Sequence, residues 1–219
     1  MARQTAASRT QEERTEVAKE RLRKAALELF AADGYEATTL AAISLKAGYS
    51  RTLAQYHYAD KSSLALELIE DRLRRDNQVE LLDCADDAPP ETAWQALMAH
   101  LEATTKHYGL LHSSSDNATM VRGEMAIHAA ALMGNDPRIT AKVDSSTRDL
   151  IARIERLLEI SRDGGLIPEA TDSHAMAVLH VHSIWGLALA LFANPKAGRQ
   201  IDAALRQIRV LLEALRNDI

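Results

Sequence analysis

Four polar side chains on one face of a short predicted helix, residues 51–58, could make contacts to DNA. At about 100° per residue, Arg51, Thr52, Gln55 and Tyr56 fall together on a helical wheel. Guanidinium and amide groups can hydrogen bond to base edges in the major groove, and hydroxyl groups can bind phosphate oxygens. The spacing therefore predicts a helix that offers one polar face to a DNA groove.

Lys61 offers a second contact of the same kind. It lies in the first turn of the helix predicted to start after Asp60, where its charge opposes the helix dipole. The free amides of that turn can receive a phosphate, so lysine and helix start together favour a phosphate contact. A solvated surface lysine is the alternative.

Glycines and hydroxyl residues divide the first sixty residues into short helices. Gly34 and Gly48 end two of them, and Thr39 and Ser50 can cap the helices predicted over 40–47 and 51–58. A first amphipathic helix is predicted over 17–33 from apolar residues at i, i+3, i+4, i+7 and i+8, namely Leu22, Ala25, Ala26, Leu29 and Phe30. The result is a helix-turn-helix unit.

The charge of the chain is unevenly distributed. The formal net charge is −5, yet residues 1–61 hold ten Lys/Arg against eight Asp/Glu, and residues 62–219 hold sixteen against twenty-three. A mildly basic front on an acidic body is typical of a small DNA-binding unit joined to a partner-binding domain. Chance asymmetry is the alternative.

Composition predicts an all-α fold, and the helical patterns along the chain divide it into about nine helices, with a three-helix N-terminal domain and a larger helical C-terminal domain. Glycine (9) and proline (5) are scarce in 219 residues, and the single cysteine, Cys84, excludes an internal disulfide and fits a reducing cytosol. No signal-peptide pattern opens the chain, and His180, His182 and Ser183 interrupt the longest apolar stretch. We expect a soluble cytoplasmic protein with no membrane partner.

The last two predicted helices, 172–193 and 198–216, carry more apolar surface than one neighbour can cover. The first is apolar nearly all round, and the second places leucine and isoleucine at heptad spacing. We expect these helices to pair with a second copy; burial of the inner helix within one chain is the alternative. The predicted interface residues are Ile184, Leu187, Leu191, Ile201, Leu205, Ile208 and Leu212.

About sixty N-terminal residues resemble the DNA-binding domain of the TetR family of transcriptional regulators. The resemblance lies in ordered motifs: Ala-Leu-x-Leu-Phe at 26–30, Gly34-Tyr35 followed by Thr38-Thr39, Ala47-Gly48 before Ser50-Arg51, and Tyr56-His57-Tyr58 followed by Lys61. It implies an Ω-shaped, all-helical homodimer and a repressor released from a palindromic operator by a small-molecule effector. The implied division is a flexible tail over 1–15, the DNA-binding domain over 16–76 with its helix-turn-helix at about 39–58, and an effector and dimerisation domain over 77–219.

The resemblance also implies roles for individual residues. Thr39 corresponds to a phosphate contact, Tyr56 and His57 to backbone contacts, and Lys61 to a phosphate-binding lysine. His57 falls away from the Arg51 face on the wheel, so its role depends on the resemblance, with packing or solvent as the alternative. The sequence departs from the family at two positions, where Gln55 replaces a common tyrosine and Ala41 a polar or basic side chain.

The C-terminal region has no motif of comparable specificity. Polar or polarisable groups on its apolar helix faces are candidates for an effector pocket, with plain core as the alternative: Tyr108, Met125, His128 and Trp185. His180 and His182 diverge around a helix, and His100 and His107 lie two turns apart, so we expect no metal site and no cofactor.

The sequence favours a regulator over other classes of protein. No nucleophile with a base, phosphate loop or ligand set indicates an enzyme. The expected partners are double-stranded operator DNA, a second copy of the chain and an unknown small-molecule effector. The alternative is a helical ligand-binding or adaptor module that has lost specific DNA binding, which Ala41 and the small basic excess would fit.

Overall fold

The computed structural model describes residues 2–77, 84–85, 87–113 and 115–216. Across these ranges the chain is all-α, as predicted, with nine α-helices, two short 3-10 helices and no strand. The α-helices are α1 (Ala2–Asp33), α2 (Leu40–Lys46), α3 (Leu53–His57), α4 (Lys61–Asn77), α5 (Pro90–Gly109), α6 (Asp116–Leu132), α7 (Pro137–Asp163), α8 (Ser173–Ala193) and α9 (Gly198–Glu213).

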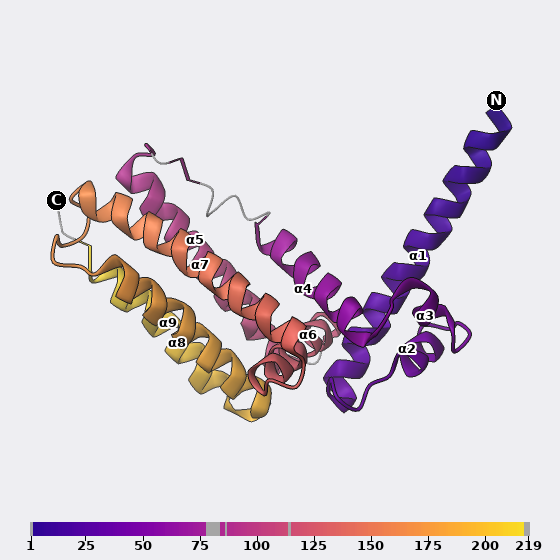
Figure 1. Cartoon of the computed structure of the whole chain (residues 1–219). Helices are drawn as coiled ribbons and strands as arrows, with labels where there is room; N and C mark the ends of the chain where they lie inside the picture. The colour runs from indigo at the N-terminus through magenta and orange to yellow at the C-terminus, as the bar shows by residue number, and fades with distance from the viewer. Residues whose placement is uncertain (1, 78–83, 86, 114, 217–219) are drawn as a thin grey trace.

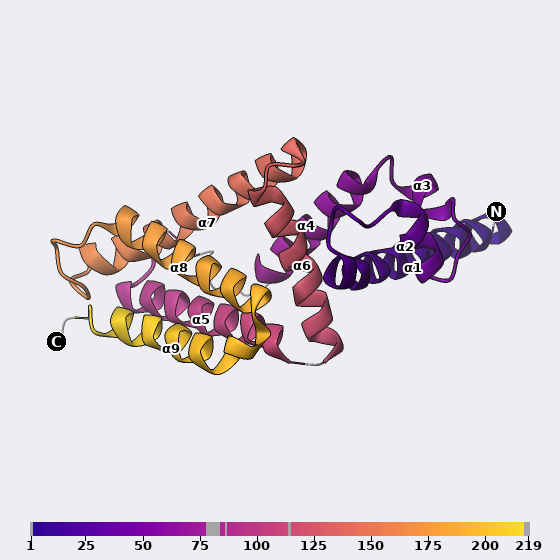
Figure 2. The same ribbon diagram turned by 90° about the horizontal axis from the view of Figure 1, so that it is seen from below.

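The helices form two groups at opposite ends of an elongated molecule (Figure 1). α1, α2 and α3 lie together at one end, and α5, α7, α8 and α9 run side by side at the other, as the view from below also shows (Figure 2). α4 and α6 lie between the two groups. The two ends of the chain are therefore far apart.

The first helix is longer than its apolar pattern predicts. α1 begins at Ala2, so residues 2–15 of the predicted flexible tail are helical in the structure. This segment lacks the apolar periodicity that predicts a helix, but it contains no glycine or proline and is rich in alanine, arginine, glutamine and glutamate. Intrinsic helix propensity thus accounts for a helix that begins before the apolar pattern does.

The N-terminal core is shared with the C-terminal region. Phe30 of α1, Ile43 of α2 and Leu64 of α4 are fully buried and cluster with Ile127 of α6 and Ile139 of α7. α1 and α6 cross closely at Gly123, where an added Cβ would lie 2.3 Å from the carbonyl oxygen of Leu27. The helix-turn-helix unit is therefore fixed to α6 and α7.

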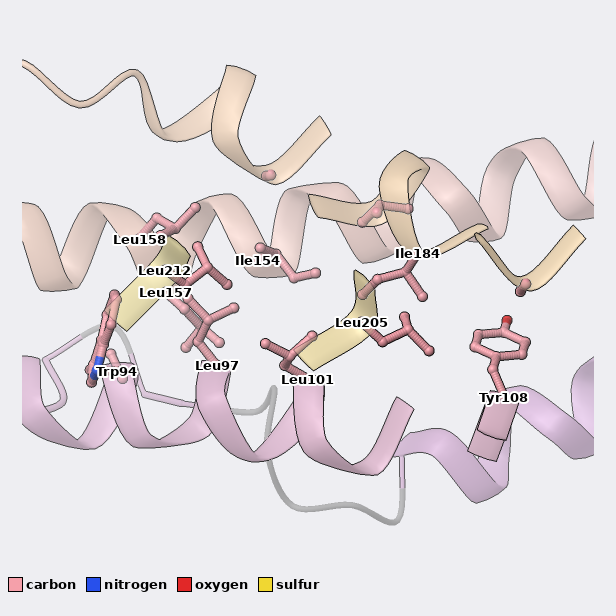
Figure 3. Packing of buried hydrophobic residues seen from close by; sticks show 14 of the residues in the cluster. Trp94, Leu97, Leu101, Tyr108, Ile154, Leu157, Leu158, Ile184, Leu205 and Leu212 are labelled. Carbon is pink, nitrogen blue, oxygen red and sulfur yellow. The ribbon is translucent and has the colours of Figure 1, made fainter. Parts of the chain in front are cut away.

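The C-terminal core corrects the predicted dimer seam. Leu205 and Leu212 of α9 point toward Leu101 and Leu97 of α5 (Figure 3), and both are buried within their own chain. Ile184, Leu191 and Ile201 are buried in the same cluster, and Leu187 and Ile208 pack against it. Five of the seven predicted interface residues are thus buried within one subunit, whereas Leu187 and Ile208 are only partly buried.

Candidate nucleic-acid interface and ligand cavity

A buried hydroxyl fixes α3 to α2. Gly48 ends the turn after α2 with a φ of +82°, in the left-handed region that glycine adopts readily. The Ser44 side chain is fully buried, and its Oγ accepts a 2.8 Å hydrogen bond from the backbone N–H of Ala54 in α3. One free amide at the start of α3 is thereby satisfied, which holds the second helix of the pair in a fixed orientation.

The predicted recognition residues lie on the outer side of α3 and in the turn before it. Arg51 and Thr52 precede the helix, which begins at Leu53 rather than at the predicted residue 51. Arg51, Thr52, Gln55 and Tyr56 are all exposed, and the Tyr56 side chain is 82% exposed. Ala54, on the opposite side, is fully buried. A helix that is anchored on one face and polar on the other can enter a major groove without losing its packing.

His57 and Thr39 lie at the margins of this surface. The half-buried His57 ring packs edge-on against Tyr56, with centroids 5.1 Å apart, in a groove also lined by Thr10 and Arg14 of α1. Thr39 is exposed at the N-terminus of α2, where its hydroxyl accepts from the N–H of Ala42 at 3.1 Å. Thr39 therefore caps α2, while its hydroxyl proton remains available to a phosphate.

Lys61 has a structural role that the sequence did not indicate. Its Nζ donates to the carbonyl oxygens of Tyr35 at 2.6 Å and Glu36 at 3.1 Å. The ammonium group also lies 4.2 Å from the centre of the Tyr35 ring, a cation–π distance. Burial lowers the pKa of Lys61, although Glu36 and Asp136 oppose that shift. The lysine thus joins α4 to the loop after α1, and two of its three protons are used within the chain.

A second set of polar contacts joins the helix-turn-helix unit to α7. Asp136 caps α7 by accepting from the N–H groups of Arg138 and Ile139, and it also accepts from the hydroxyl of Ser62 in α4. Burial alone would raise the pKa of Asp136, but these hydrogen bonds lower it overall. Arg138 pairs with Asp60 at 2.8 Å. The start of α4 is therefore held by the start of α7 as well as by the loop after α1.

A cavity of about 180 Å³ lies among α4, α5, α6, α7 and α8. Three of the four predicted pocket residues, Tyr108, His128 and Trp185, line it. Met125 does not; it is buried in the C-terminal core on α6, so its assignment to the pocket is corrected to core packing. Sequence reasoning missed Arg72 and considered His180 only as a metal ligand, because the pattern within one helix does not show which helices meet around the cavity.

Arg72 connects the wall of the cavity to the helix-turn-helix unit. It belongs to α4, and its Nη2 donates to the hydroxyl of Tyr108 on α5. Its Nε lies 4.0 Å from the carboxylate of Glu124 on α6, which His107 approaches at 3.3 Å. A ligand in the cavity would therefore contact a side chain of the helix that follows α3.

The histidines do not gather into a metal site. His180 is buried while His182 is exposed, as their divergence on one helix requires. Within the residues that the structure describes, no group of three histidine, cysteine, aspartate or glutamate side chains could hold a metal ion. α8 has the length and composition of a membrane span, but Val181, Ile184 and Leu191 on it are buried in the core.

Comparison with known proteins gives a family match and a shared fold. The sequence model described as "Bacterial regulatory proteins, tetR family" matches residues 22–68. None of the curated proteins matches the chain. The fold is similar to the SmeT–triclosan complex, with a TM-score of 0.70 and 22% identity over 90% of this chain and 88% of that one.

Two further solved structures resemble the chain over nearly its whole length. SmeT, the repressor of the Stenotrophomonas maltophilia multidrug efflux pump SmeDEF, has a TM-score of 0.67 at 22% identity, covering 91% of both chains. The MbdR regulator from Azoarcus sp. CIB has a TM-score of 0.65 at 17% identity, covering 90% of this chain and 98% of that one. At these identities the structures establish the fold alone, and residues 22–68 carry the N-terminal sequence pattern of the tetR family of bacterial regulatory proteins.

Proposed function

We propose that the chain is a sequence-specific DNA-binding transcriptional regulator, a homodimeric repressor that leaves a palindromic operator when a small molecule binds. The observation that carries this proposal is the polar surface of α3 and of the turn before it, where Arg51, Thr52, Gln55 and Tyr56 are exposed while the other face of the helix is anchored. Thr39 and His57 would add backbone contacts at its margins. A regulator of this kind would act in the cytoplasm. Its TetR-family relatives are regulators rather than enzymes, which supports the same class for this chain.

A mobility-shift experiment tests DNA recognition. The full-length protein is titrated against the DNA upstream of its own gene and against a random pool from which bound sequences are selected. We expect a palindromic site and a complex that weakens as salt rises, because phosphate contacts release counterions. Failure to select any site would favour the adaptor alternative instead.

Within a selected site, Gln55 tests base readout. Gln55→Ala should lose roughly 1–3 kcal/mol at particular base pairs and little elsewhere, because an amide can bond two groups of one base edge. Gln95→Ala is the matched control, since Gln95 is an exposed glutamine on α5, away from α3. Equal losses on every sequence would contradict a base contact by Gln55.

The dimer surface would lie on the outer sides of α8 and α9. Leu179, Val210 and Leu211 are 59%, 51% and 62% exposed, and Gly186 on α8 has open space around it. Exposed apolar side chains next to small residues let a helix from a second copy approach closely. This outer face replaces the buried heptad seam as the proposed interface.

Light scattering tests the dimer. Gly186→Arg should shift the protein from dimer to monomer, because a charged side chain would be buried without a partner at the centre of the proposed interface. Ala152→Arg, on the exposed side of α7, is the matched control and should leave the mass unchanged. A dimeric Gly186→Arg protein would contradict this surface.

The response to a ligand would pass through α4. Arg72 forms part of the cavity wall and donates to Tyr108, so a ligand that competes for Tyr108 would alter how α4 is held. One structure of similar fold is SmeT in complex with triclosan, which supports a small-molecule effector. We expect Tyr108→Phe to retain operator binding but to need more ligand for release.

The proposed domains remain 16–76 and 77–219, with a core that continues from the first into α6 and α7.

A further inference from the structure

A buried polar side chain in the cavity has both of its ring nitrogens without a hydrogen-bond partner. His180 on α8 is only 4% exposed and lines the cavity, and neither Nδ1 nor Nε2 meets a donor or acceptor within the described part of the chain. Buried imidazole nitrogens in folded proteins are normally bonded, because leaving them unbonded costs free energy. The position of His180 is therefore explained if a ligand supplies the missing bond.

A second histidine in the same cavity shows the ordinary arrangement. His128 Nδ1 lies 2.8 Å from the carbonyl oxygen of Glu124, to which it donates as a neutral ring. Burial lowers the pKa of His128 and of His180 to about 4, and positive Arg72 beside the first and His100 beside the second act in the same direction. Both rings are therefore neutral at physiological pH, and His180 offers one donor and one acceptor.

Two of the cations in the wall already have carboxylate neighbours. Arg72 lies beside Glu124, and Lys142 pairs with Glu70 at 3.2 Å. A ligand carboxylate would have to compete with these acids while lying against neutral imidazoles. A hydroxyl group suits His180 better, because it can donate to one bare ring nitrogen or accept from a ring N–H without bringing a charge into the cavity.

One part of the wall suits a single ring, although residues 145–147, Asp149 and Arg153 of α7 also give the cavity a polar side. Ile184, Val181 and Ile69 give the cavity apolar sides, and the Trp185 indole lies edge-on to His128 with centroids 4.7 Å apart. Aromatic rings pack well at such distances, and an engineered cavity of about 150 Å³ holds one benzene. A volume of about 180 Å³ therefore fits one substituted ring.

We propose that the cavity takes a neutral, single-ring aromatic compound bearing a hydroxyl group, and that His180 is the side chain that hydrogen bonds this hydroxyl. The proposal rests on the proposed function, in that it names the chemical class of the effector. It concerns binding by the protein alone, so it can be tested without operator DNA.

Calorimetric titration of the full-length protein with three probes tests the class. The probes are 4-methylphenol, toluene, which lacks the hydroxyl, and benzoate, which is charged. We expect 4-methylphenol to bind at least about tenfold more tightly than the other two, because it alone combines one ring with a neutral hydroxyl. Equal or tighter binding of toluene or benzoate, or no binding of 4-methylphenol, would overturn the proposal.

Variants of His180 test the residue. His180→Phe should weaken 4-methylphenol about tenfold and leave toluene unchanged or improved, whereas His180→Gln, which keeps a donor and an acceptor, should retain part of the affinity. His182→Phe on the exposed side of α8 is the matched control. Thermal melting checks that each variant folds. If His180→Phe does not fold, the affinities of His180→Leu and His180→Gln for 4-methylphenol decide whether His180 bonds the hydroxyl.

Operator binding in the same samples separates this proposal from the proposed function. If 4-methylphenol binds through His180 but does not displace DNA, the release mechanism fails and the assignment of the cavity stands. If another compound displaces DNA while 4-methylphenol does not bind, the repressor function stands and the assignment of its effector class is wrong.

Discussion

The helix-turn-helix surface and the cavity place their polar groups in opposite ways. Arg51, in the turn before α3, and Gln55 on α3 are exposed, and the buried side of α3 is held where Ala54 bonds to Ser44 of α2. In the cavity, His128 and His180 are buried among five helices and are neutral. A recognition surface can therefore be built from one helix face, whereas a cavity needs the packing of many.

The largest expected effect separates the two regions by pH. The unfolded chain binds protons at His128 and His180 below their ordinary pKa of 6.5, whereas the folded chain binds them only near pH 4. The free energy of unfolding therefore carries no penalty from these two histidines above pH 6.5. As the pH falls from 6.5 toward 4, it decreases by up to about 1.4 kcal/mol per pH unit for each histidine. Urea denaturation across this window measures the slope.

Single variants assign that slope to the cavity. His128→Gln and His180→Gln should each make the stability of the protein less dependent on pH, because each removes one group that titrates differently in the two states. Neither should change the intrinsic affinity for DNA at neutral pH. A slope equal to that of the unaltered protein would mean that the two rings are not held neutral by burial.

The next effect tests the crossing that joins the two regions. Gly123→Ala would bring a Cβ within 2.3 Å of the backbone oxygen of Leu27, so α1 and α6 must separate. We expect a loss of roughly 1–3 kcal/mol in unfolding free energy and weaker DNA binding, because α1 carries the helix-turn-helix unit. Denaturant titration and mobility shift measure the two effects.

Gly109→Ala is the control for this crossing. Gly109 ends α5, and an added Cβ would approach only a side-chain atom of Asp202 at 4.0 Å, an ordinary contact. Its stability should stay the same or rise, since alanine favours helix over glycine. If both variants behaved alike, the α1–α6 crossing would not be the close contact that couples the regions.

The sequence predicts well those features that depend on residue spacing within a single helix or turn. Gly48 and the exposed Arg51 face are local, so spacing alone indicated the helix-turn-helix unit and motif order indicated the family. Periodicity also identified the apolar seam of Leu205 and Leu212, but it does not say which surface covers a seam, and here the chain's own α5 does so.

The cavity could be predicted only in part. Tyr108, His128 and Trp185 are polar groups on apolar faces, which is a signal within one helix. Arg72 and His180 line the pocket only because α4 and α8 both border the cavity. The sequence pattern of one helix cannot show which other helices lie beside it. The role of Lys61 was missed for the same reason, since its bonds reach back to the loop after α1.

The smallest expected effect concerns Lys61 and tests whether it belongs to the surface or to the core. Lys61→Met should cost about 1 kcal/mol in stability by removing the bonds to Tyr35 and Glu36, and should leave the salt dependence of operator binding nearly unchanged. Arg51→Met should do the reverse: it should leave stability unchanged and reduce the slope of log affinity against log salt by about one, because an exposed phosphate contact is lost. If Lys61→Met flattened the slope as much as Arg51→Met, the third proton of the ammonium group would be contacting phosphate, and Lys61 would belong to the DNA surface as well as to the fold.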